Sequence, residues 1–405
     1  MTVGHRAHLR LSVFVSLVLA VGAPVAAQDP PAGPNQDAPV SEVLSFLLTN
    51  QSVPTGDFVK DAQAAATTAD TINRLLLAEL TTLPLSSSSA GFTYRVNPQL
   101  GTVERASQSF GPFFAERSLT AGRGQASLGV TLQFAKYTRL NDVDLGSGTL
   151  VTTANQFRDE PAPFDLEALT LEMESRTLTF LGNVGLTDWL DVGVAVPVVS
   201  LSLEGSRVNT YRGQQLVQAT GTADTTGLGD MAIRAKVRLY GSAGTGLSLL
   251  AESRLPTGSR EDLLGSGEAS FTAIIVGSYE PGRFGAHANA RLTRGGLLDE
   301  VSLNGAVSFS PSPRVTLLGE VLGRRIDGIG RLAQERVPHP TIAGVDTLRL
   351  ITTDDSVNTS AVTAGVRWNV AGAWLVNAGL TVPVVNHGLR SQATAVVGFD
   401  YAFGG

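Results

Sequence analysis

The chain has 405 residues, a net charge of −6 and no cysteine. The acidic balance argues against nucleic acid as a partner, because phosphate groups demand a basic protein surface. Without cysteine there is no disulfide framework, so stability must come from apolar burial or from closed backbone hydrogen bonding. Glycine is unusually frequent, at 44 residues, which suits a chain of many strands and short turns.

Residues 1–27 have the features of an export signal. Arg6 and Arg10 supply a positive start, residues 11–21 are apolar, and small residues end the segment at Ala27. This order is typical of a cleaved signal peptide, and the apolar stretch is short for the alternative, a retained membrane anchor. No later stretch reaches the ~20 apolar residues of a membrane helix. The exported chain is then either soluble or inserted as a β-barrel, whose strands escape hydropathy scans.

Residues 28–90 precede the strand-rich part of the chain. Residues 28–40 are polar and rich in proline, which indicates a flexible leader. Residues 41–48 and 56–83 carry helical signals, and the apolar positions that recur at helical spacing are Ala62, Ala65, Ala66, Ala69, Ile72, Leu75, Leu76 and Leu80. An isolated helix of this length is marginal in water. We therefore expect either a small periplasmic helical segment or a plug docked in the periplasmic mouth of a barrel.

From about Gly91 onward the hydrophobic period changes to two, which indicates strands. Residues 91–96 and 102–109 form a weak candidate hairpin. The stronger candidate strands are 124–140, 166–186, 189–206, 229–240, 247–256, 268–279, 284–293, 300–309, 314–325, 356–368, 374–384 and 391–403.

The connections between these strands alternate in length. The long ones cover 141–165, 207–228, 257–267 and 326–355, and the short ones cover 187–188, 241–246, 280–283, 310–313 and 369–373. This alternation is typical of bacterial outer-membrane barrels, in which the short turns face the periplasm. Residues 91–405 are therefore predicted to form an all-β, antiparallel, up-and-down transmembrane barrel of about 12 strands, or about 14 if the weak hairpin joins the wall.

Alternation within the strands separates a polar face from an apolar one. In 229–240, Ile233 and Val237 share one face, and Arg234 and Lys236 share the other. A charge facing lipid at mid-membrane would cost ~2–4 kcal/mol, so the polar faces must point inward. The alternative is a soluble sheet with one wet face. The residues predicted to line the lumen are Arg234, Lys236, Arg238, Glu252, Arg254, His287, Asn289, Arg291, Glu320 and Arg324.

Aromatic residues on the apolar faces gather beside the predicted periplasmic turns and the C-terminus. They are Tyr279, Phe284, Phe309, Trp368, Trp374, Tyr401 and Phe403. Amphipathic rings belong at the membrane–water boundary, so they predict a girdle at one interface. Trp189 also adjoins a short turn, but it shares the strand parity of Asp191 and does not fit the girdle. The last strand, Val397–Phe403, resembles the C-terminal signal that barrel-assembly machinery recognises, so this machinery is an expected partner.

Glycine-containing motifs occur in the middle of the chain. Residues 227–239 are GLGDMAIRAKVRL, and residues 251–258 are AESRLPTG, followed by LGSGE at 264–268. Together they resemble the signature of the MetA-pathway phenol-degradation family of outer-membrane proteins, a relative of the fatty-acid-channel type of barrel. The resemblance implies uptake of aromatic or other hydrophobic compounds and carries over no substrate residue. Within the motif, Asp230 is expected to cap a loop amide, the alternative being contact with the arginine face.

The sequence offers little support for an enzyme. It contains neither a Gly-x-Ser-x-Gly elbow nor a His-Glu-x-x-His zinc motif. His287, His339 and His387 lie on separate predicted elements, and a triad would have to assemble from them in space. The acidic pairs at 142–144 and 354–355 lack the spacing of a calcium loop. We therefore predict no metal, no cofactor and no enzymatic activity.

The predicted function is that of a channel in the cell outer membrane. Small molecules, with hydrophobic or aromatic ones among them, would diffuse through the charged lumen, and outer-membrane lipid would surround the wall. A structural or adhesive barrel with a blocked lumen is the alternative, and an outer-membrane hydrolase is a third reading.

Overall fold

The computed structural model of the protein describes most of the chain after residue 37. The described residues are 34, 38–49, 58–81, 85, 87–88, 91, 93–96, 103–105, 107–242, 245–329, 331–353, 356–385 and 387–403. The expected signal peptide, residues 1–27, and most of the expected leader lie outside them. The helices within the described residues are α1 (Val40–Thr49) and α2 (Phe58–Thr81), and neither is long and apolar enough to cross a membrane.

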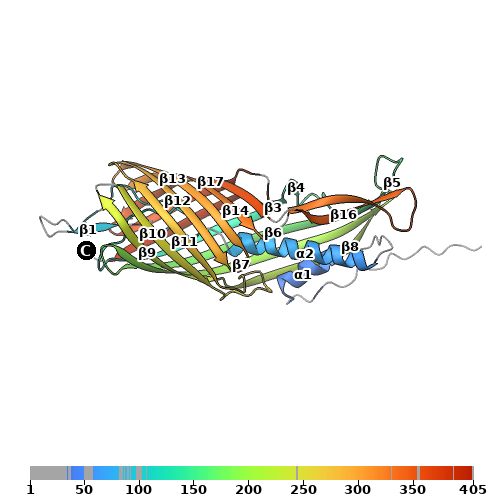
Figure 1. Ribbon diagram of the computed structural model, residues 1–405, viewed down its shortest axis with the longest axis horizontal. Coiled ribbons are helices and arrows are strands. Elements are labelled where there is room, and N and C mark those ends of the chain that lie inside the picture. Colours follow the sequence, from blue (N-terminus) through green and yellow to red (C-terminus); the bar gives the residue numbers. More distant parts are fainter. Residues whose placement is uncertain are drawn as a thin grey trace, which may run out of the picture.

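A closed antiparallel barrel dominates the described part of the chain (Figure 1). Its wall strands are β3 (Ala126–Leu140), β6 (Asp165–Gly185), β7 (Leu190–Tyr211), β9 (Met231–Ser242), β10 (Thr245–Leu255), β11 (Ser270–Tyr279), β12 (Phe284–Gly295), β13 (Asp299–Ser312), β14 (Val315–Asp327), β17 (Ser356–Ala371), β18 (Trp374–Pro383) and β19 (Leu389–Phe403). Each strand pairs with the next in this order, and β19 pairs with β3 to close the wall. The predicted barrel of 12 strands is therefore confirmed.

The weak hairpin does not join this wall. Its strands β1 (Tyr94–Val96) and β2 (Val103–Arg105) pair with each other in a separate two-stranded sheet. The fourteen-strand alternative is therefore wrong. Each of these strands has 3 residues, which is too short to cross a membrane as a tilted strand.

The two ends of the barrel differ in their connections. One end, which we call the short-turn end, carries the turns between β6 and β7, β11 and β12, β13 and β14, and β17 and β18, together with the end of β19. The opposite end, the long-loop end, carries the longer connections. In Figure 1 the short-turn end lies on the left, beside the C-terminus.

Several connections that the sequence left as long loops contain further strands. These are β4 (Val143–Asp144), β5 (Leu150–Phe157), β8 (Gln214–Leu228), β15 (Arg331–Pro338) and β16 (Val345–Thr353). β8 pairs with the far half of β7, and β5 joins the start of β6 to β16 and β15. These segments are not loops, because they continue the hydrogen-bonded ladders of the wall beyond its rim. We use the name extension for the sheet that lies beyond the rim of the wall. It consists of β15, β16, β5, β8 and the parts of β6 and β7 that continue past the rim, and it projects to the right in Figure 1.

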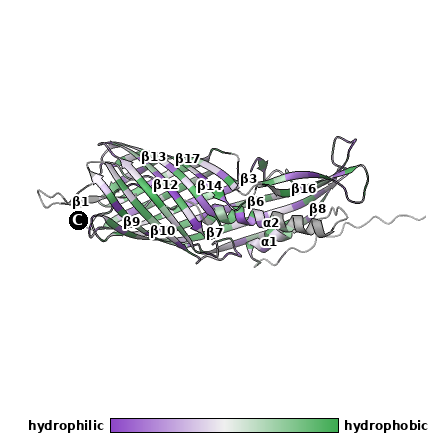
Figure 2. Ribbon diagram, viewed as in Figure 1, coloured by the Kyte–Doolittle hydropathy of each residue, from purple (hydrophilic) through white to green (hydrophobic). Residues whose placement is uncertain are grey.

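The outward face of the wall is apolar. Leu303 is 68% exposed, Val307 61% and Ile275 57%, and Figure 2 shows hydrophobic and hydrophilic residues alternating along the wall strands. The polar residues of these strands are buried inside, so the alternation matches a wall between an apolar medium and a polar interior. A patch of this extent on a protein in water would be an association or aggregation surface. It fits contact with lipid instead.

Aromatic side chains mark the short-turn end of this apolar band. Phe284 and Phe309 stack with ring centroids 4.8 Å apart, and Trp374 lies 4.7 Å from Tyr401. Trp189 is 51% exposed as well. It lies in the turn before β7, where the alternation of a strand does not apply.

The apolar band ends before the extension begins. On β7 the outward residues are valine at 192, 194, 196 and 198, and then serine at 200 and 202 and glutamate at 204. At the same level Lys136 bridges Glu172 (3.0 Å) and Glu174 (3.3 Å) across β3 and β6, and all three side chains are largely exposed. The extension therefore stands beyond the lipid-facing band, in water.

A charge placed in the middle of the band tests this assignment. Leu303 lies six residues from the girdle residue Phe309 on β13, which brings it near the centre of a ~25 Å apolar band. We expect Leu303→Arg to lower the free energy of unfolding in lipid by roughly 2–4 kcal/mol, measured by urea titration of the protein in vesicles. Leu303→Ala is the uncharged control and should cost clearly less. Equal costs for the two variants would contradict the lipid-facing assignment.

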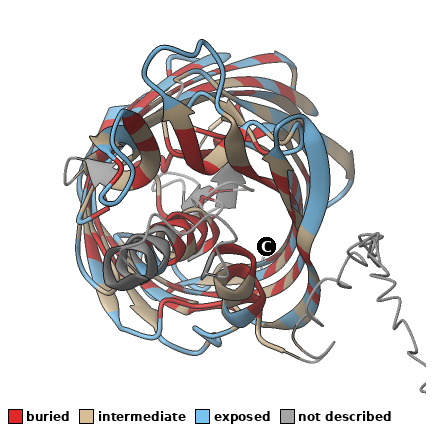
Figure 3. Cartoon of the chain, turned by 90° about the vertical axis from the view of Figure 1, so that its right-hand side faces the viewer, coloured by how far each residue is buried: buried red, intermediate tan, exposed pale blue. Residues whose placement is uncertain are grey.

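Seen along the barrel, both helices lie inside the ring of strands (Figure 3), and Figure 1 shows them toward the long-loop end, beside β8. Leu44 and Leu47 of α1 and Leu76 of α2 are buried in one apolar core with the inward faces of β6, β7 and β8. Helix α1 packs closely against β7 because Gly205 of β7 lacks a side chain. A Cβ at this position would lie 2.5 Å from the Leu47 side chain of α1. Docking at the short-turn mouth, the expected place, is therefore wrong. The large apolar surface that receives the helices includes the inward faces of β6, β7 and β8, whereas the short-turn half of the described interior combines charged groups with smaller apolar clusters.

Candidate functional site

Residues 107–121, which we call the inner segment, cross the barrel interior before β3 begins. Residues 109–118 are all buried, and the segment has no place in the wall. Side chains of the wall bind its backbone at both ends: the Thr316 hydroxyl accepts a hydrogen bond from the Phe110 N–H (3.0 Å), and the Asp191 carboxylate accepts one from the Ala121 N–H (2.8 Å). The inner segment is thus held by side chains and not by a strand ladder.

Glu320 of β14 holds the middle of the inner segment. Its carboxylate accepts hydrogen bonds from the backbone N–H groups of Phe113, Phe114 (3.0 Å) and Ala115 (2.9 Å). The Phe113 ring also lies 5.0 Å from the Arg367 guanidinium, and a Cβ on the neighbouring Gly365 would come within 2.6 Å of the ring. Hydrogen bonds to an ionised acceptor are among the strongest in proteins, so this contact fixes the segment across the lumen.

Glu116 is the charged centre of the inner segment. Its carboxylate lies 3.1 Å from Lys236 Nζ and 3.7 Å from an Arg234 guanidinium nitrogen. Arg234 also binds Glu252 (2.8 Å), which in turn binds Arg254 (3.0 Å). Apart from the partly exposed Arg254, these side chains are nearly inaccessible to water, so each charge depends on its neighbours for compensation.

Three further wall residues bind the backbone at or next to Glu116. Asn289 accepts a hydrogen bond from the Glu116 N–H (2.6 Å) and donates one to the Glu116 carbonyl (2.9 Å). The Ser278 hydroxyl accepts from the Ser118 N–H (2.8 Å), and the Ser248 hydroxyl donates to the Ser118 carbonyl (2.6 Å). Backbone groups that leave a sheet must find other partners when they are buried, and here the polar inner face of the wall supplies them.

His287 belongs to the same network. Its Nδ1 lies 3.0 Å from Ser278 Oγ, and its Nε2 lies 3.7 Å from a Glu280 oxygen. Serine, histidine and glutamate therefore meet inside the barrel, as a hydrolase triad would require. However, the Ser278 hydroxyl already binds the inner segment, and the fully buried Arg117 lies 3.8 Å from Glu280. The group thus serves to anchor residues 117 and 118.

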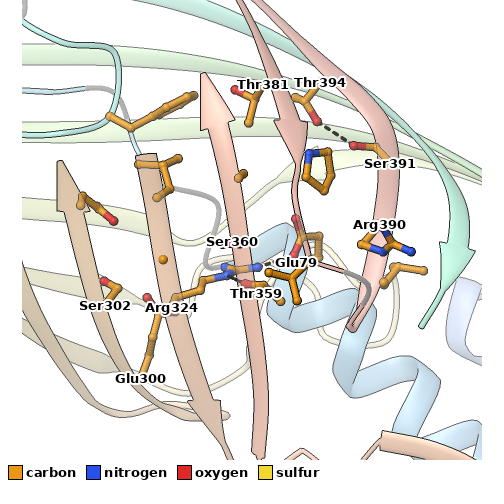
Figure 4. A pocket seen from close by; sticks show the side chains of 18 of the residues that line it. Glu79, Glu300, Ser302, Arg324, Thr359, Ser360, Thr381, Arg390, Ser391 and Thr394 are labelled. Atoms are coloured by element: carbon orange, nitrogen blue, oxygen red, sulfur yellow. Dashed lines mark hydrogen bonds and ion pairs between the residues drawn. The ribbon is translucent and has the colours of Figure 1, made fainter. Parts of the chain in front are cut away.

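A central cavity of about 100 Å³ lies beyond the inner segment, toward the helices (Figure 4). Its walls come from the end of α2, from the inner segment and from β12 to β14 and β17 to β19. Arg324 projects into it from β14 and binds Glu79 of α2 and the Thr359 hydroxyl (2.9 Å). Along one side, the ladder between β18 and β19 stops at the pair Thr381 and Thr394, both of which line the cavity.

The structure brings the predicted lumen residues together in two groups. Lys236, Arg234, Glu252, Arg254, His287, Asn289 and Glu320 hold the inner segment or its partners. Arg291 and Arg324 line the central cavity, and Arg238 is half-buried near the short-turn end. All ten side chains are buried or half-buried. The sequence left open whether they would pair or meet water, and in the structure most of them bind protein groups.

Asp230, in the glycine-containing motif, holds a loop of the long-loop end. Its carboxylate accepts hydrogen bonds from the Gly258 N–H (3.1 Å), the Ser266 N–H (2.8 Å) and the Ser266 hydroxyl (2.7 Å). The expectation that Asp230 caps a loop amide is confirmed. The loop is thereby folded inward, so that Leu263 and Leu264 join the core around the helices. The motif thus has a structural role in closing the long-loop end.

Sequence reasoning missed the inner segment and Glu116. The signal was present but easily overlooked: residues 109–116 (SFGPFFAE) follow neither a strand nor a helix period, yet they are largely apolar. A buried stretch without a period, placed directly before the first strong strand, has to lie inside the barrel. Which wall residues it contacts could not be read from the pattern.

These features together define a class of protein. A closed antiparallel barrel with an apolar outer band, an aromatic girdle and a polar interior satisfies every backbone hydrogen bond of its wall within lipid. The protein is an outer-membrane β-barrel, and the predicted location in the cell outer membrane is confirmed.

One family model matches part of the chain. Residues 154–300 match the model of a family described as a proposed MetA-pathway of phenol degradation, which confirms the resemblance drawn from the glycine-containing motifs. The match covers a little over a third of the chain. No curated protein matches the chain in sequence.

Solved outer-membrane barrels are similar at low identity. An outer-membrane channel of Pseudomonas putida F1 is 13% identical, with a TM-score of 0.45 over 71% of this chain and 98% of that one. The translocator domain of the autotransporter NalP from Neisseria meningitidis is 10% identical (TM-score 0.36, 70% and 89% covered). The toluene transporter TbuX of Ralstonia pickettii is 9% identical (TM-score 0.29, 70% and 90% covered). At these scores the comparisons add nothing to the geometry described above.

Proposed function

We propose that the protein is an outer-membrane channel for small molecules, in which the inner segment forms the constriction. The observation that carries the proposal is the way the segment is held. Residues 109–118 cross a closed barrel with no ladder to the wall, and side chains such as Glu320 and Asn289 bind them. Because side chains and not a strand ladder bind the segment, the segment can leave its position without breaking the backbone pairing of the wall.

The substrates in this proposal are small hydrophobic or aromatic molecules. The match to a family described by phenol degradation supports this class, and so do the apolar side chains that line the central cavity, among them Phe114, Leu322 and Leu389. Lipid surrounds the apolar band. We also propose that barrel-assembly machinery recognises β19, whose outward Phe399 and Phe403 end the wall. No step requires a metal, a cofactor or an enzymatic group.

A structural or adhesive barrel with a permanently blocked lumen is the alternative function. The buried ion pairs around Glu116 favour it, because a tightly held segment would not move. The two functions differ in one measurable property, namely whether displacement of the inner segment opens a conducting path.

An engineered disulfide that holds the inner segment in place can distinguish these two functions by experiment. The natural chain has no cysteine, so Ser118→Cys with Gly246→Cys introduces a single pair. A Cβ on Gly246 would lie 3.0 Å from the Ser118 Cβ, close enough for a disulfide after a shift of under ~1 Å. We expect single-channel conductance in planar bilayers to be abolished by oxidation and restored by a reductant, because the disulfide ties the segment to β10.

The single variants Ser118→Cys and Gly246→Cys are the controls, and neither should respond to the reductant. Equal conductance in the oxidised and reduced double variant would show that the inner segment does not gate the channel. Absence of conductance in every state would favour the blocked barrel.

A further inference from the structure

The central cavity combines charge with apolar surface. Phe114 of the inner segment, Leu322 of β14 and Leu389 of β19 contribute apolar side chains. Three arginines and two glutamates also line it, which leaves one net positive charge. The arginines are Arg291, Arg324 and Arg390, and the glutamates are Glu79 and Glu300. Figure 4 shows Arg324, Arg390, Glu79 and Glu300 around the same space.

Arg291 stands out because it lacks a partner. Arg324 binds Glu79, and Arg390 donates to the Asn141 carbonyl (2.9 Å). Within the described residues, no hydrogen bond and no ion pair reaches the Arg291 guanidinium, and its Nε is buried without an acceptor. Yet Arg291 is only 9% exposed. A guanidinium taken out of water is costly unless something replaces the lost hydrogen bonds.

The carboxylates near Arg291 do not satisfy it. Glu252 and Glu300 are the opposite charges that act on it. Glu252 is already bound by Arg234 (2.8 Å) and Arg254 (3.0 Å). Glu300 lies on the cavity wall without a hydrogen bond or ion pair to Arg291. The planar donor face of Arg291 is thus left for a group that is not part of the described chain.

Arg291 lies at the junction of two cavities inside the barrel. A second cavity, of about 40 Å³, lies toward the long-loop end beside Ser266, Gly296 and Leu298. Arg291 and Glu300 line both this cavity and the central one. They stand where the two spaces meet, so a molecule in either cavity can reach Arg291.

We propose that the central cavity binds a small organic anion, a carboxylate on an apolar body about the size of one aromatic ring, and that Arg291 pairs with the carboxylate. This inference rests on the proposed channel function and names the substrate class. Arginine presents two parallel N–H donors that match the two oxygens of a carboxylate. The side chains of Phe114, Leu322 and Leu389 form an apolar surface against which the apolar part of the anion can pack. The central cavity has a volume of about 100 Å³, which is similar to that of a protein cavity that binds benzene (~150 Å³). It is too small for a long acyl chain.

Equilibrium dialysis of the detergent-purified full chain tests the site without relying on transport. We expect benzoate to bind saturably, and benzyl alcohol, which lacks the charge, and acetate, which lacks the ring, to bind more weakly. Arg291→Gln should weaken benzoate binding roughly 10-fold to 100-fold, as expected for loss of charge-assisted hydrogen bonds. Arg294→Gln is the matched control on the same strand, because Arg294 is exposed and pairs with Asp299 at the surface (3.0 Å). It should leave the affinity unchanged.

A gain of affinity provides a test that misfolding cannot imitate. Glu300→Gln removes the carboxylate that competes for Arg291, so benzoate should bind more tightly than to the natural protein. Unchanged affinity in both Arg291→Gln and Glu300→Gln would overturn the proposal, and so would equal binding of benzoate and benzyl alcohol.

Conductance of the same preparation tests the channel function separately from the anion site. Conductance without benzoate binding rejects the anion site alone, and binding without conductance rejects the channel.

Discussion

Removal of residues 41–118 is expected to raise single-channel conductance on the order of tenfold, because the emptied lumen of a barrel of this size approaches a water-filled channel. Removal of residues 41–83 alone should change the conductance little. The helices occupy the half near the long-loop end, whereas the inner segment crosses the other half and stays bound to Glu320 and Asn289. When two obstacles lie in series along one pore, the narrower of them sets the conductance.

Planar-bilayer recordings of the two deletion variants distinguish these obstacles. Both variants must first run as folded, heat-modifiable barrels in electrophoresis, since loss of the helices exposes the apolar lining of the extension to water. If the shorter deletion raised conductance as much as the longer one, the helices would be the barrier. The inner segment would then have only a structural role.

Glu167→Ala is expected to destabilise the docking of α1 by about 3–5 kcal/mol. Glu167 and Arg207 form an ion pair (2.6 Å) on β6 and β7, and both side chains are at most 1% exposed. Arg207 also donates a hydrogen bond to the Leu47 carbonyl (2.9 Å) in the last turn of α1, where helical carbonyls lack partners. Removal of the carboxylate leaves a buried guanidinium uncompensated. Hydrogen exchange of the α1 amides measures the loss.

Two controls separate this effect from the loss of an ordinary charge. The pair variant Glu167→Leu with Arg207→Met should recover most of the stability, because apolar residues of similar volume avoid the desolvation cost. Glu172→Ala, which breaks the exposed contact with Lys136 (3.0 Å), should cost less than ~1 kcal/mol. Equal losses for Glu167→Ala and Glu172→Ala would contradict the buried role of the pair.

The wall of the barrel could be predicted in detail from the sequence. The twelve stronger candidate strands correspond to the twelve wall strands; the predicted 284–293, for example, is β12, Phe284–Gly295. The prediction works because each residue of a membrane strand faces either lipid or the interior, and the period of two reports this choice locally. The period carries no such information where the alternation breaks. Trp189 lies in a turn, and Tyr240 is 61% exposed beside a bulge in the pairing of β9 with β10.

The extension and the helix position were not predicted, for a different reason. β5 and β16 become strands because they meet each other across 188 positions of sequence or more, as between Phe157 and Val345. Neither has a strong pattern of its own. Likewise, the apolar face of α2 shows that the helix needs a partner, but several apolar surfaces would satisfy it.

The sequence by itself determined which side chains point inward, because lipid excludes charge from the outer face. The tertiary structure decided what those side chains bind. Asn289 and Glu116 are 173 positions apart, and Glu320 and Phe114 are 206 apart. They meet only once the wall has closed around the inner segment. A hydrophobic period records the medium that each residue faces, whereas the partner of a buried polar group depends on the three-dimensional path of the whole chain. For this reason the sequence left open whether the charged lumen residues would pair or meet water. In the structure Arg234, Lys236 and Glu320 bind the inner segment, and Arg291 lines the cavity.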